Sequence, residues 1–283
     1  MKFSLLLATL HRTAEISYFL KSLDAQTYRD FELIVIDQNL DDRLVDILAP
    51  YQGKFPINHL RSAKGLSLAR NVGIQQISGS LVAFPDDDCA YPPDLLERVH
   101  RFFTESPQQD GLTGRPAGNA SIWDRQSGPI TPINLWRRGI SYTIFLRRPV
   151  VVKVGGFDES LGVGAGTPWG SGEESDYLLR AIQADFQLHY EPTLTVVHPV
   201  KLPEADRPVP LPQAPRDFTK TYAYAMGRGR LLRKHRYPFW FVIYNWLRPS
   251  AGLAIALVRG RRDNMRSYWA TLQGRFQGWL GWA

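Results

Sequence analysis

Continuous apolar runs recur through the first third of this 283-residue chain. A strand with one face in solvent alternates polar and apolar residues. This alternation is absent from the three runs Phe3–Thr9, Phe31–Ile36 and Leu81–Phe84. They predict central parallel strands, and Ile57–Leu60 is a further short candidate. Helical segments are expected between them, at 13–25, 64–77 and 92–103. The alternation predicts a doubly wound α/β sheet.

Three consecutive carboxylates, Asp86, Asp87 and Asp88, follow the third of these runs. Like charges this close resist ionisation unless a cation lies among them. Carboxylate oxygens suit Mg²⁺ or Mn²⁺, which also bind phosphates. In an open parallel sheet, ligands gather at the carboxyl ends of the strands. The cluster therefore predicts a metal that bridges the protein to a nucleotide's diphosphate, and a solvated acidic turn is the alternative.

Charge is distributed unevenly along the chain. The net charge is +7, yet residues 218–283 hold 12 Lys and Arg against one acid, and the remainder holds 22 against 26. The same C-terminal segment contains five of the eight tryptophans. This asymmetry predicts a polyanionic surface as partner. A single cysteine, Cys89, excludes an internal disulfide and zinc sites built on several cysteines, as is typical of a reducing compartment.

The C-terminal segment has two apolar runs, Phe239–Leu247 and Ala251–Val258, split by Arg248 and Pro249. Neither reaches the ~20 residues that span a bilayer, and joining them would bury Arg248. We expect helices that lie on an anionic membrane surface, with aromatic rings at head-group depth. A helical cap packed on the body is the alternative. No nucleic-acid motif accompanies the basic residues, so nucleic acid is not an expected partner.

The middle of the chain is less regular. Residues 106–140 predict long loops, and Gly162–Gly172, with five glycines around Trp169, predicts a mobile substrate loop. Tyr142–Leu146 is a candidate strand, followed by the apolar run Val150–Val154. Further elements are expected as a helix at Glu173–Ala184, strands at Leu188–Tyr190 and Leu194–Val197 ending at His198, and a proline-rich linker at 199–215.

Several linked motifs between about residue 3 and residue 198 resemble family 2 glycosyltransferases. They are Ser22–Tyr28, Phe31–Asp37, Gly65–Gly73, Asp86–Asp88, Gly155–Glu159 and Gly172–Asp176. The resemblance implies the GT-A fold, a Rossmann-like doubly wound mixed sheet, and inverting, metal-dependent transfer of sugar from a nucleotide donor. It covers a domain at 1–200. The linker at 201–217 and the helical, membrane-associating extension at 218–283 lie beyond it.

The resemblance also assigns a donor site. Asp37 falls where the family binds the base or ribose, and Gln38 replaces the second Asp of a common pair. Arg70 matches an arginine that approaches the diphosphate, as its guanidinium fork suits phosphate oxygens. The turn after the first strand supplies Thr9 and Arg12 as further donor contacts. Asp86 and Asp88 match the Asp-x-Asp metal motif, Asp87 is expected on ribose, and His198 is a further metal ligand.

The pair Glu173-Glu174 resembles the family's Glu-Asp motif, whose second residue is the base. Glu174 is therefore the leading candidate to deprotonate the acceptor hydroxyl, with Asp176 and then Glu173 behind it. The ring of Trp169 is the candidate acceptor platform. The expected acceptor is a saccharide or lipid-linked saccharide in cell-surface polysaccharide synthesis, at the cytoplasmic face of the inner membrane. The sequence says nothing of the oligomeric state.

Two other functions stay open at this point. A degenerate scaffold could bind nucleotide-sugar without turnover, given Gln38 and the Glu at position 174. A nucleotidyltransferase also joins an α/β sheet to acidic metal ligands, although Thr9–Arg12 lacks the glycine-rich turn usual there. Processive synthesis is disfavoured, since Asp217 stands where a Gln-x-x-Arg-Trp motif from Gln213 requires Trp.

Overall fold

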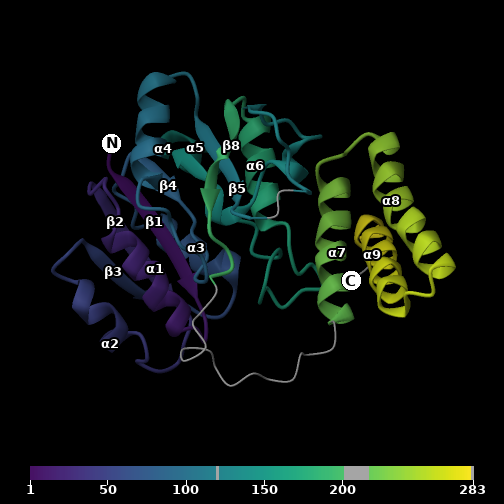
Figure 1. Cartoon of the computed structure of the whole chain (residues 1–283), viewed down its shortest axis with the longest axis horizontal. Coiled ribbons are helices and arrows are strands. Elements are labelled where there is room, and N and C mark those ends of the chain that lie inside the picture. Colours follow the sequence, from purple (N-terminus) through teal and green to yellow (C-terminus); the bar gives the residue numbers. More distant parts are fainter. Residues whose placement is uncertain (119–120, 201–216, 282–283) are drawn as a thin grey trace. The chain divides into compact units, whose positions relative to one another are not determined.

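The computed structural model describes residues 1–118, 121–200 and 217–281. The chain divides into two compact units, each described by itself (Figure 1). Apart from the residues outside the description, the sheet unit comprises Met1–Lys64, Leu68–Phe157 and Tyr177–Pro208, and the helical unit comprises Gly65–Ser67, Asp158–Asp176 and Val209–Ala283. Most of the predicted linker, 201–216, lies outside the described residues.

Among the described residues, eight strands form one mixed sheet in the order β3-β2-β1-β4-β7-β5-β8-β6. The first four are parallel, as the apolar runs predict; β7 is antiparallel to β4 and β5, and β8 is parallel to β5. The α/β prediction is confirmed. The strands are β1 Phe3–Thr9, β2 Phe31–Asp37, β3 Ile57–Arg61, β4 Leu81–Ala83, β5 Gly111–Pro116, β6 Gly128–Pro129, β7 Phe145–Arg147 and β8 Leu188–Val196.

Helices cover both faces of the parallel strands because the side chains of a strand alternate between its faces. Leu5 and Leu7 of β1 join one core with residues of α1 and α4. Leu6 and Ile36 point the other way, toward Gly73 of α3. The helices before the C-terminal segment are α1 Ala14–Asp24, α2 Val45–Leu48, α3 Leu66–Ile74, α4 Leu95–Glu105, α5 Arg148–Val154 and α6 Glu173–Gln183, with 3₁₀ turns η1 Ala49–Tyr51, η2 Leu135–Arg137 and η3 Ser141–Thr143.

Three local expectations are wrong. The predicted loop at 106–140 contains β5, whose sequence lacks an apolar run because its glycines meet close neighbours. A Cβ on Gly111 would lie 2.5 Å from a Leu188 methyl, and one on Gly114 would meet the Leu194 backbone. The candidate strand Tyr142–Leu146 divides into η3 and β7, with the following apolar run in helix α5. The two strands expected at 188–197 are the single strand β8.

A polar network ties the amino-terminal ends of β1, β2 and β4 together. Glu32 on β2 accepts hydrogen bonds from Lys2 Nζ at 2.7 Å and Ser4 Oγ at 2.6 Å. It also accepts from the amide and hydroxyl of Ser78, before β4. Burial would raise the pKa of Glu32, but these donors outweigh it and lower the pKa to about 2 from 4.5.

Glu32→Gln is expected to destabilise the protein by roughly 1–2 kcal/mol at neutral pH, after allowance for solvent screening. Because folding depresses the pKa of Glu32, its contribution is complete above about pH 4.5 and is lost as pH falls toward 2. Urea unfolding across this window measures it. A pH dependence in the variant as steep as in the wild type would contradict the assignment.

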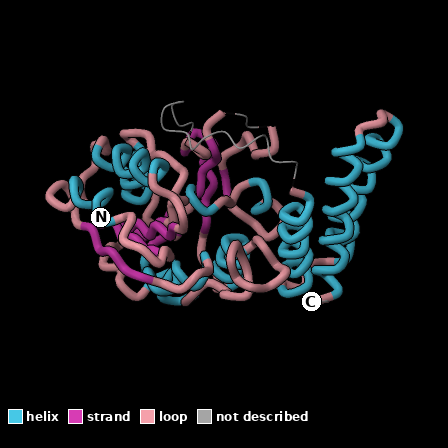
Figure 2. Tube along the Cα trace, turned by 90° about the horizontal axis from the view of Figure 1, so that it is seen from below, coloured by secondary structure: helices cyan, strands magenta, loops and turns pink. Residues whose placement is uncertain are grey.

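In the helical unit, α7 Phe218–Lys234, α8 Phe239–Val258 and α9 Arg262–Leu280 pack on one another (Figures 1 and 2). Small residues allow α7 and α9 to approach closely. A Cβ on Gly274 would meet the Tyr222 carbonyl, and one on Gly278 would meet that of Met226. Any larger side chain at these two positions of α9 would separate the two helices.

The two apolar runs of the C-terminal segment form one helix, α8, contrary to the expected break. Proline at 249 removes the hydrogen bond to the Asn245 carbonyl. Arg275 Nη1 of α9 donates to that carbonyl at 2.7 Å, and Arg228 Nε of α7 donates to Asn245 Oδ1 at 2.7 Å. The broken backbone bond is thus replaced by one from a neighbouring helix. By length and composition alone, α8 is long and apolar enough to cross a membrane.

Candidate active site

The acidic cluster lies at the carboxyl ends of the parallel strands, as predicted. Thr9 is the last residue of β1, and its Oγ1 donates to Asp87 Oδ2 at 2.8 Å. An antiparallel bridge between Ala90 and Val197 joins the chain just after the cluster to the end of β8. The bridge places His198 against the cluster. The backbone thus brings together residues far apart in sequence.

Asp86, Asp88 and His198 lie close enough together to hold a metal ion. Their ligand atoms all lie within 4.8 Å of one another. His198 Nε2 is 2.9 Å from Asp88 Oδ1 and 3.8 Å from Asp86 Oδ2. Neighbouring ligands of an octahedral ion at about 2.1 Å are separated by about 3 Å, so small side-chain shifts suffice. Two carboxylates and an imidazole are a donor set for a divalent cation.

Two arginines from separate elements contact the acids. Arg70, only 1% exposed on α3, donates from Nη2 to Asp86 Oδ1 at 3.2 Å. Arg12, in the turn after β1, donates to Asp88 Oδ2 at 3.0 Å and lies 3.6 Å from Asp87. The Arg70 guanidinium also lies 5.3 Å from the centre of the Phe157 ring. The guanidinium fork of each arginine is of the kind that suits phosphate oxygens.

The three acids differ in their ionisation. Burial raises the pKa of Asp86, against the opposing charge of Arg70, and raises that of Asp87 to about 6. At Asp88, burial is outweighed by the hydrogen bond and charge of His198, so its pKa falls below its usual value. Asp88 raises the pKa of His198 in return, although burial opposes this. Asp88 is therefore the most fully ionised of the three acids, as expected of a direct metal ligand.

Asp37 ends β2 and is fully buried. Its carboxylate is held by the Asn39 amide and side chain, by His59 Nε2 at 3.0 Å and by Arg61 at 2.9 Å. Gln38 is nearly buried and donates to the Thr9 carbonyl. The structure thus places Asp37 and Gln38 beside the end of β1. Their contact with a base or ribose stays a prediction.

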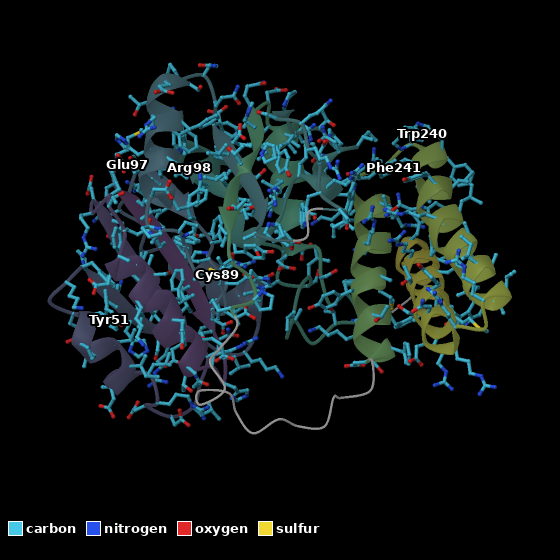
Figure 3. All side chains as sticks on the ribbon, viewed as in Figure 1. Tyr51, Cys89, Glu97, Arg98, Trp240 and Phe241 are labelled. Carbon is cyan, nitrogen blue, oxygen red and sulfur yellow. The ribbon has the colours of Figure 1, made fainter. Side chains whose placement is uncertain are left out.

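Sequence reasoning missed several residues that build this site. Tyr142 stacks on the His198 ring at 4.2 Å, and Ser141 Oγ donates to Asp86 at 3.0 Å. His59 and Arg61 of β3 hold Asp37 in place. Only this last pair carried a signal, since polar side chains recur at the end of a parallel strand. Cys89 lies in the hydrophobic core with a pKa raised by burial, and its thiol is not a candidate ligand (Figure 3).

In the helical unit, the glycine-rich segment is closed by its own hydrogen bonds. Gly162 N donates to the Trp169 carbonyl at 3.0 Å, and Thr167 Oγ1 donates to that of Ser160 at 2.6 Å. Gly162 has φ of 99°, which favours glycine, and a Cβ there would meet Glu173. Arg230 of α7 stacks on the Trp169 ring at 4.5 Å. One face of the proposed acceptor platform is thus covered by a guanidinium.

The first turn of α6 carries Glu173, Glu174 and Asp176, as predicted. Asp176 is fully buried and pairs with Lys234 Nζ at 2.6 Å and His235 Nε2 at 2.8 Å. Lys234 also binds Asp158 at 2.7 Å. The end of α7 therefore fixes both the start of α6 and Asp158, which precedes the glycine-rich segment. This arrangement gives Asp176 a structural task that the sequence does not reveal.

Lys234→Met is expected to destabilise the protein by about 2–4 kcal/mol, because it removes the ammonium that pairs with the buried carboxylate of Asp176. Chemical denaturation measures the loss. The matched control is Lys220→Met, an exposed lysine of the same helix. Equal stability of the two variants would show that the buried pair contributes nothing.

Comparison with known proteins identifies the family of this chain. The model of the family described as glycosyl transferase family 2 matches residues 4–157. The chain belongs to this family. An uncharacterized glycosyltransferase of Haemophilus influenzae is 26% identical over 193 residues, 64% of this chain and 62% of that protein. A PGL/p-HBAD biosynthesis glycosyltransferase of Mycobacterium bovis is 34% identical over 40% of this chain and 45% of its own length. The chain thus spans less than two thirds of either relative.

Solved glycosyltransferase structures share the fold. S. aureus TarS has a TM-score of 0.62 at 18% identity, over 95% of this chain and 55% of that one. The mannosyltransferase PcManGT from Pyrobaculum calidifontis, solved with GDP-Man and Mn²⁺, has a TM-score of 0.62 at 16% identity, over 99% and 86%. The family prediction and the GT-A-type α/β fold are thereby confirmed.

Proposed function

We propose that this family 2 member is an inverting glycosyltransferase that moves a sugar from a nucleoside-diphosphate donor to an acceptor hydroxyl. The observation that carries the proposal is the convergence of Asp86, Asp88 and His198 with Arg70 and Arg12 at the strand ends. Two arginines beside a divalent-cation site suit a diphosphate. A merely solvated acidic turn needs neither a buried arginine nor an imidazole.

Each side chain then has a task. Asp86, Asp88 and His198 hold the cation, and the imidazole favours Mn²⁺ over Mg²⁺. When bound, the cation neutralises charge that develops on the leaving diphosphate. Arg70 and Arg12 stabilise the same oxygens, and Asp87, held by Thr9, is directed to the ribose. The side chains of Asp37 and Gln38 contribute to recognition of the base. A neighbour solved with GDP-Man and Mn²⁺ supports this donor class.

Glu174 is the proposed base. It accepts the proton of the acceptor hydroxyl as the oxygen attacks the anomeric carbon and the nucleoside diphosphate departs, which inverts that carbon. Asp176 is less suited, because protonation would weaken its pairs with Lys234 and His235. Trp169 offers a ring face to the C–H groups of a saccharide acceptor.

The acceptor is proposed to be a saccharide or lipid-linked saccharide, used in polysaccharide synthesis at the cytoplasmic face of the inner membrane. Support comes from α8, whose exposed side chains include Phe239, Trp240, Tyr244 and Leu247. Figure 3 shows Trp240 and Phe241 at its start; Trp240 is 60% exposed, whereas Phe241 is buried. An exposed aromatic face with arginines nearby suits an anionic membrane surface.

Calorimetric titration with UDP, GDP and dTDP, with and without Mn²⁺, tests the donor site. We expect one diphosphate to bind in a metal-dependent manner, and Asp88→Ala to weaken binding by roughly 100-fold through lost coordination. Asp94→Ala, an exposed acid outside the site, is the matched control. Failure of the wild type to bind any of the three would overturn the proposal.

Glu174→Gln is expected to lower kcat by roughly 10²–10⁴-fold while diphosphate affinity stays unchanged. Asp176→Asn should instead lower Tm, because it removes a charge that Lys234 and His235 need. Glu173→Gln is measured in the same way, because Glu173 is the third candidate base in this turn. Proton NMR of the product reports the anomeric configuration. Retention would refute inversion, and binding without any turnover would favour the degenerate scaffold.

A further inference from the structure

A cavity of about 120 Å³ lies where α8 turns into α9. Figure 2 shows the two helices joined there into a hairpin. Its polar lining comes from Arg259, Arg261, Asn264 and Tyr268, and its apolar lining includes Ile255 and Ala256. The volume accommodates several water-sized groups and hence a tetrahedral anion. Nothing in the proposed transfer reaction uses this cavity.

The lining is strongly basic. Arg259 and Arg261 are exposed, and neither guanidinium has a hydrogen bond or ion pair among the described residues. Asp263 is the one acid of the C-terminal segment and is not among the lining residues. The sequence Arg259–Asp263 thus carries three positive charges against one negative charge. Two guanidiniums that face one cavity form a site for a phosphate.

The start of α9 adds backbone donors. Arg261 is the N-cap residue, and its side chain makes no capping bond. First-turn amides of a helix have no partners within the helix and favour an anion there. The Arg262 amide already donates to the Gly260 carbonyl at 3.1 Å, which leaves the amides that follow it. Asp263, in that first turn, offsets part of this field. The helix start therefore assists the arginines and would not suffice alone.

Apolar side chains beside the cavity indicate what the phosphate is attached to. Ile255 lines the cavity and is exposed, and Leu257 and Val258 follow it on α8. Val258 is 90% exposed, and Leu257 is 55% exposed. Acyl or prenyl chains would cover these side chains. An amphiphile with a phosphate matches both halves of the surface, whereas a free nucleotide or sugar phosphate does not.

We propose that this cavity binds the phosphate of a membrane lipid, with Arg259 and Arg261 on the phosphate and the lipid chain over Leu257 and Val258. The inference rests on the proposed membrane association and gives it a specific contact. The phosphate can belong to a glycerophospholipid or to a polyprenyl phosphate. Diffuse attraction by the basic segment needs no cavity, and this difference is what an experiment can detect.

Two pairs of variants separate a site from diffuse attraction. Arg259→Gln/Arg261→Gln removes the lining charges, and Arg262→Gln/Arg266→Gln removes the same charge from exposed positions outside the lining. Gly252→Ala leaves the charge unchanged. Its added methyl would lie 2.5 Å from the Tyr268 ring, which must then shift in the cavity wall. Thermal unfolding confirms that each variant folds.

The full-length protein is titrated with short-chain phosphatidylglycerol below its critical micelle concentration, and calorimetry measures the binding. We expect wild type and the Arg262/Arg266 control to bind alike. The Arg259/Arg261 variant should bind at least tenfold more weakly, and Gly252→Ala should also bind more weakly. Inorganic phosphate is the head-group-only probe and should bind more weakly than the lipid. Equal binding by the two charge variants would overturn the proposal.

Flotation with vesicles separates the two levels of inference. Vesicles of phosphatidylcholine alone are compared with vesicles containing either phosphatidylglycerol or polyprenyl phosphate at equal charge. A preference that the Arg259/Arg261 variant loses identifies the lipid that supplies the phosphate. Wild type that floats with neither anionic lipid overturns membrane association itself. Flotation that both charge variants retain equally overturns only the cavity site, and the donor titration is independent of both results.

Discussion

The repulsion among three adjacent carboxylates at the end of β4 is the constraint on which the sheet unit's site depends. Asp86 and Asp87 are buried enough that their pKa values rise, so the cluster is stable only with cations close by. Arg70 and Arg12 supply two such charges from separate elements, and the imidazole of His198 lies 2.9 Å from Asp88. Asp86 in turn offsets part of the cost of burying the Arg70 guanidinium. The acids and the basic side chains therefore hold one another in place.

The fold was predictable where hydrophobicity alone determines the structure. The runs that became β1, β2 and β4 are buried on both faces, so their sequences are largely apolar, whereas the edge strand β3 is only partly buried. Strand β5 was not predicted because the residues of neighbouring strands approach so closely that positions 111 and 114 must be glycine. Glycine in a sequence is more typical of a loop than of a strand. The position of Asp86–Asp88 at the carboxyl ends of the strands was predictable, because the acids directly follow the apolar run that became β4. The contact of His198 with Asp88 depends on the Ala90–Val197 bridge, a long-range pairing that no local pattern encodes.

Helix α8 shows how a tertiary contact overrides a local rule. Proline at position 249 is expected to interrupt a helix, and the sequence alone therefore predicts a break there. The Asn245 carbonyl that loses its partner instead accepts from Arg275 of α9, and Arg228 of α7 holds the Asn245 side chain. Burial lowers the pKa of Arg228 to about 9 and that of Arg275 to about 10. Burying the two charged guanidiniums is therefore electrostatically unfavourable, and their hydrogen bonds to Asn245 offset part of this cost. Two arginines that read as membrane-binding charges are thus partly structural.

The distinction between a structural and a functional role also applies to the three acids of α6. All three lie in its first turn, where the helix dipole favours the ionised form of each, so position alone does not choose a base. Asp176 pairs with Lys234 and His235, and these pairs hold the end of α7 against the start of α6. A proton taken from an acceptor would cancel the carboxylate charge on which those pairs depend. Asp176 is therefore less suited than the more exposed Glu174 to the proposed role of base.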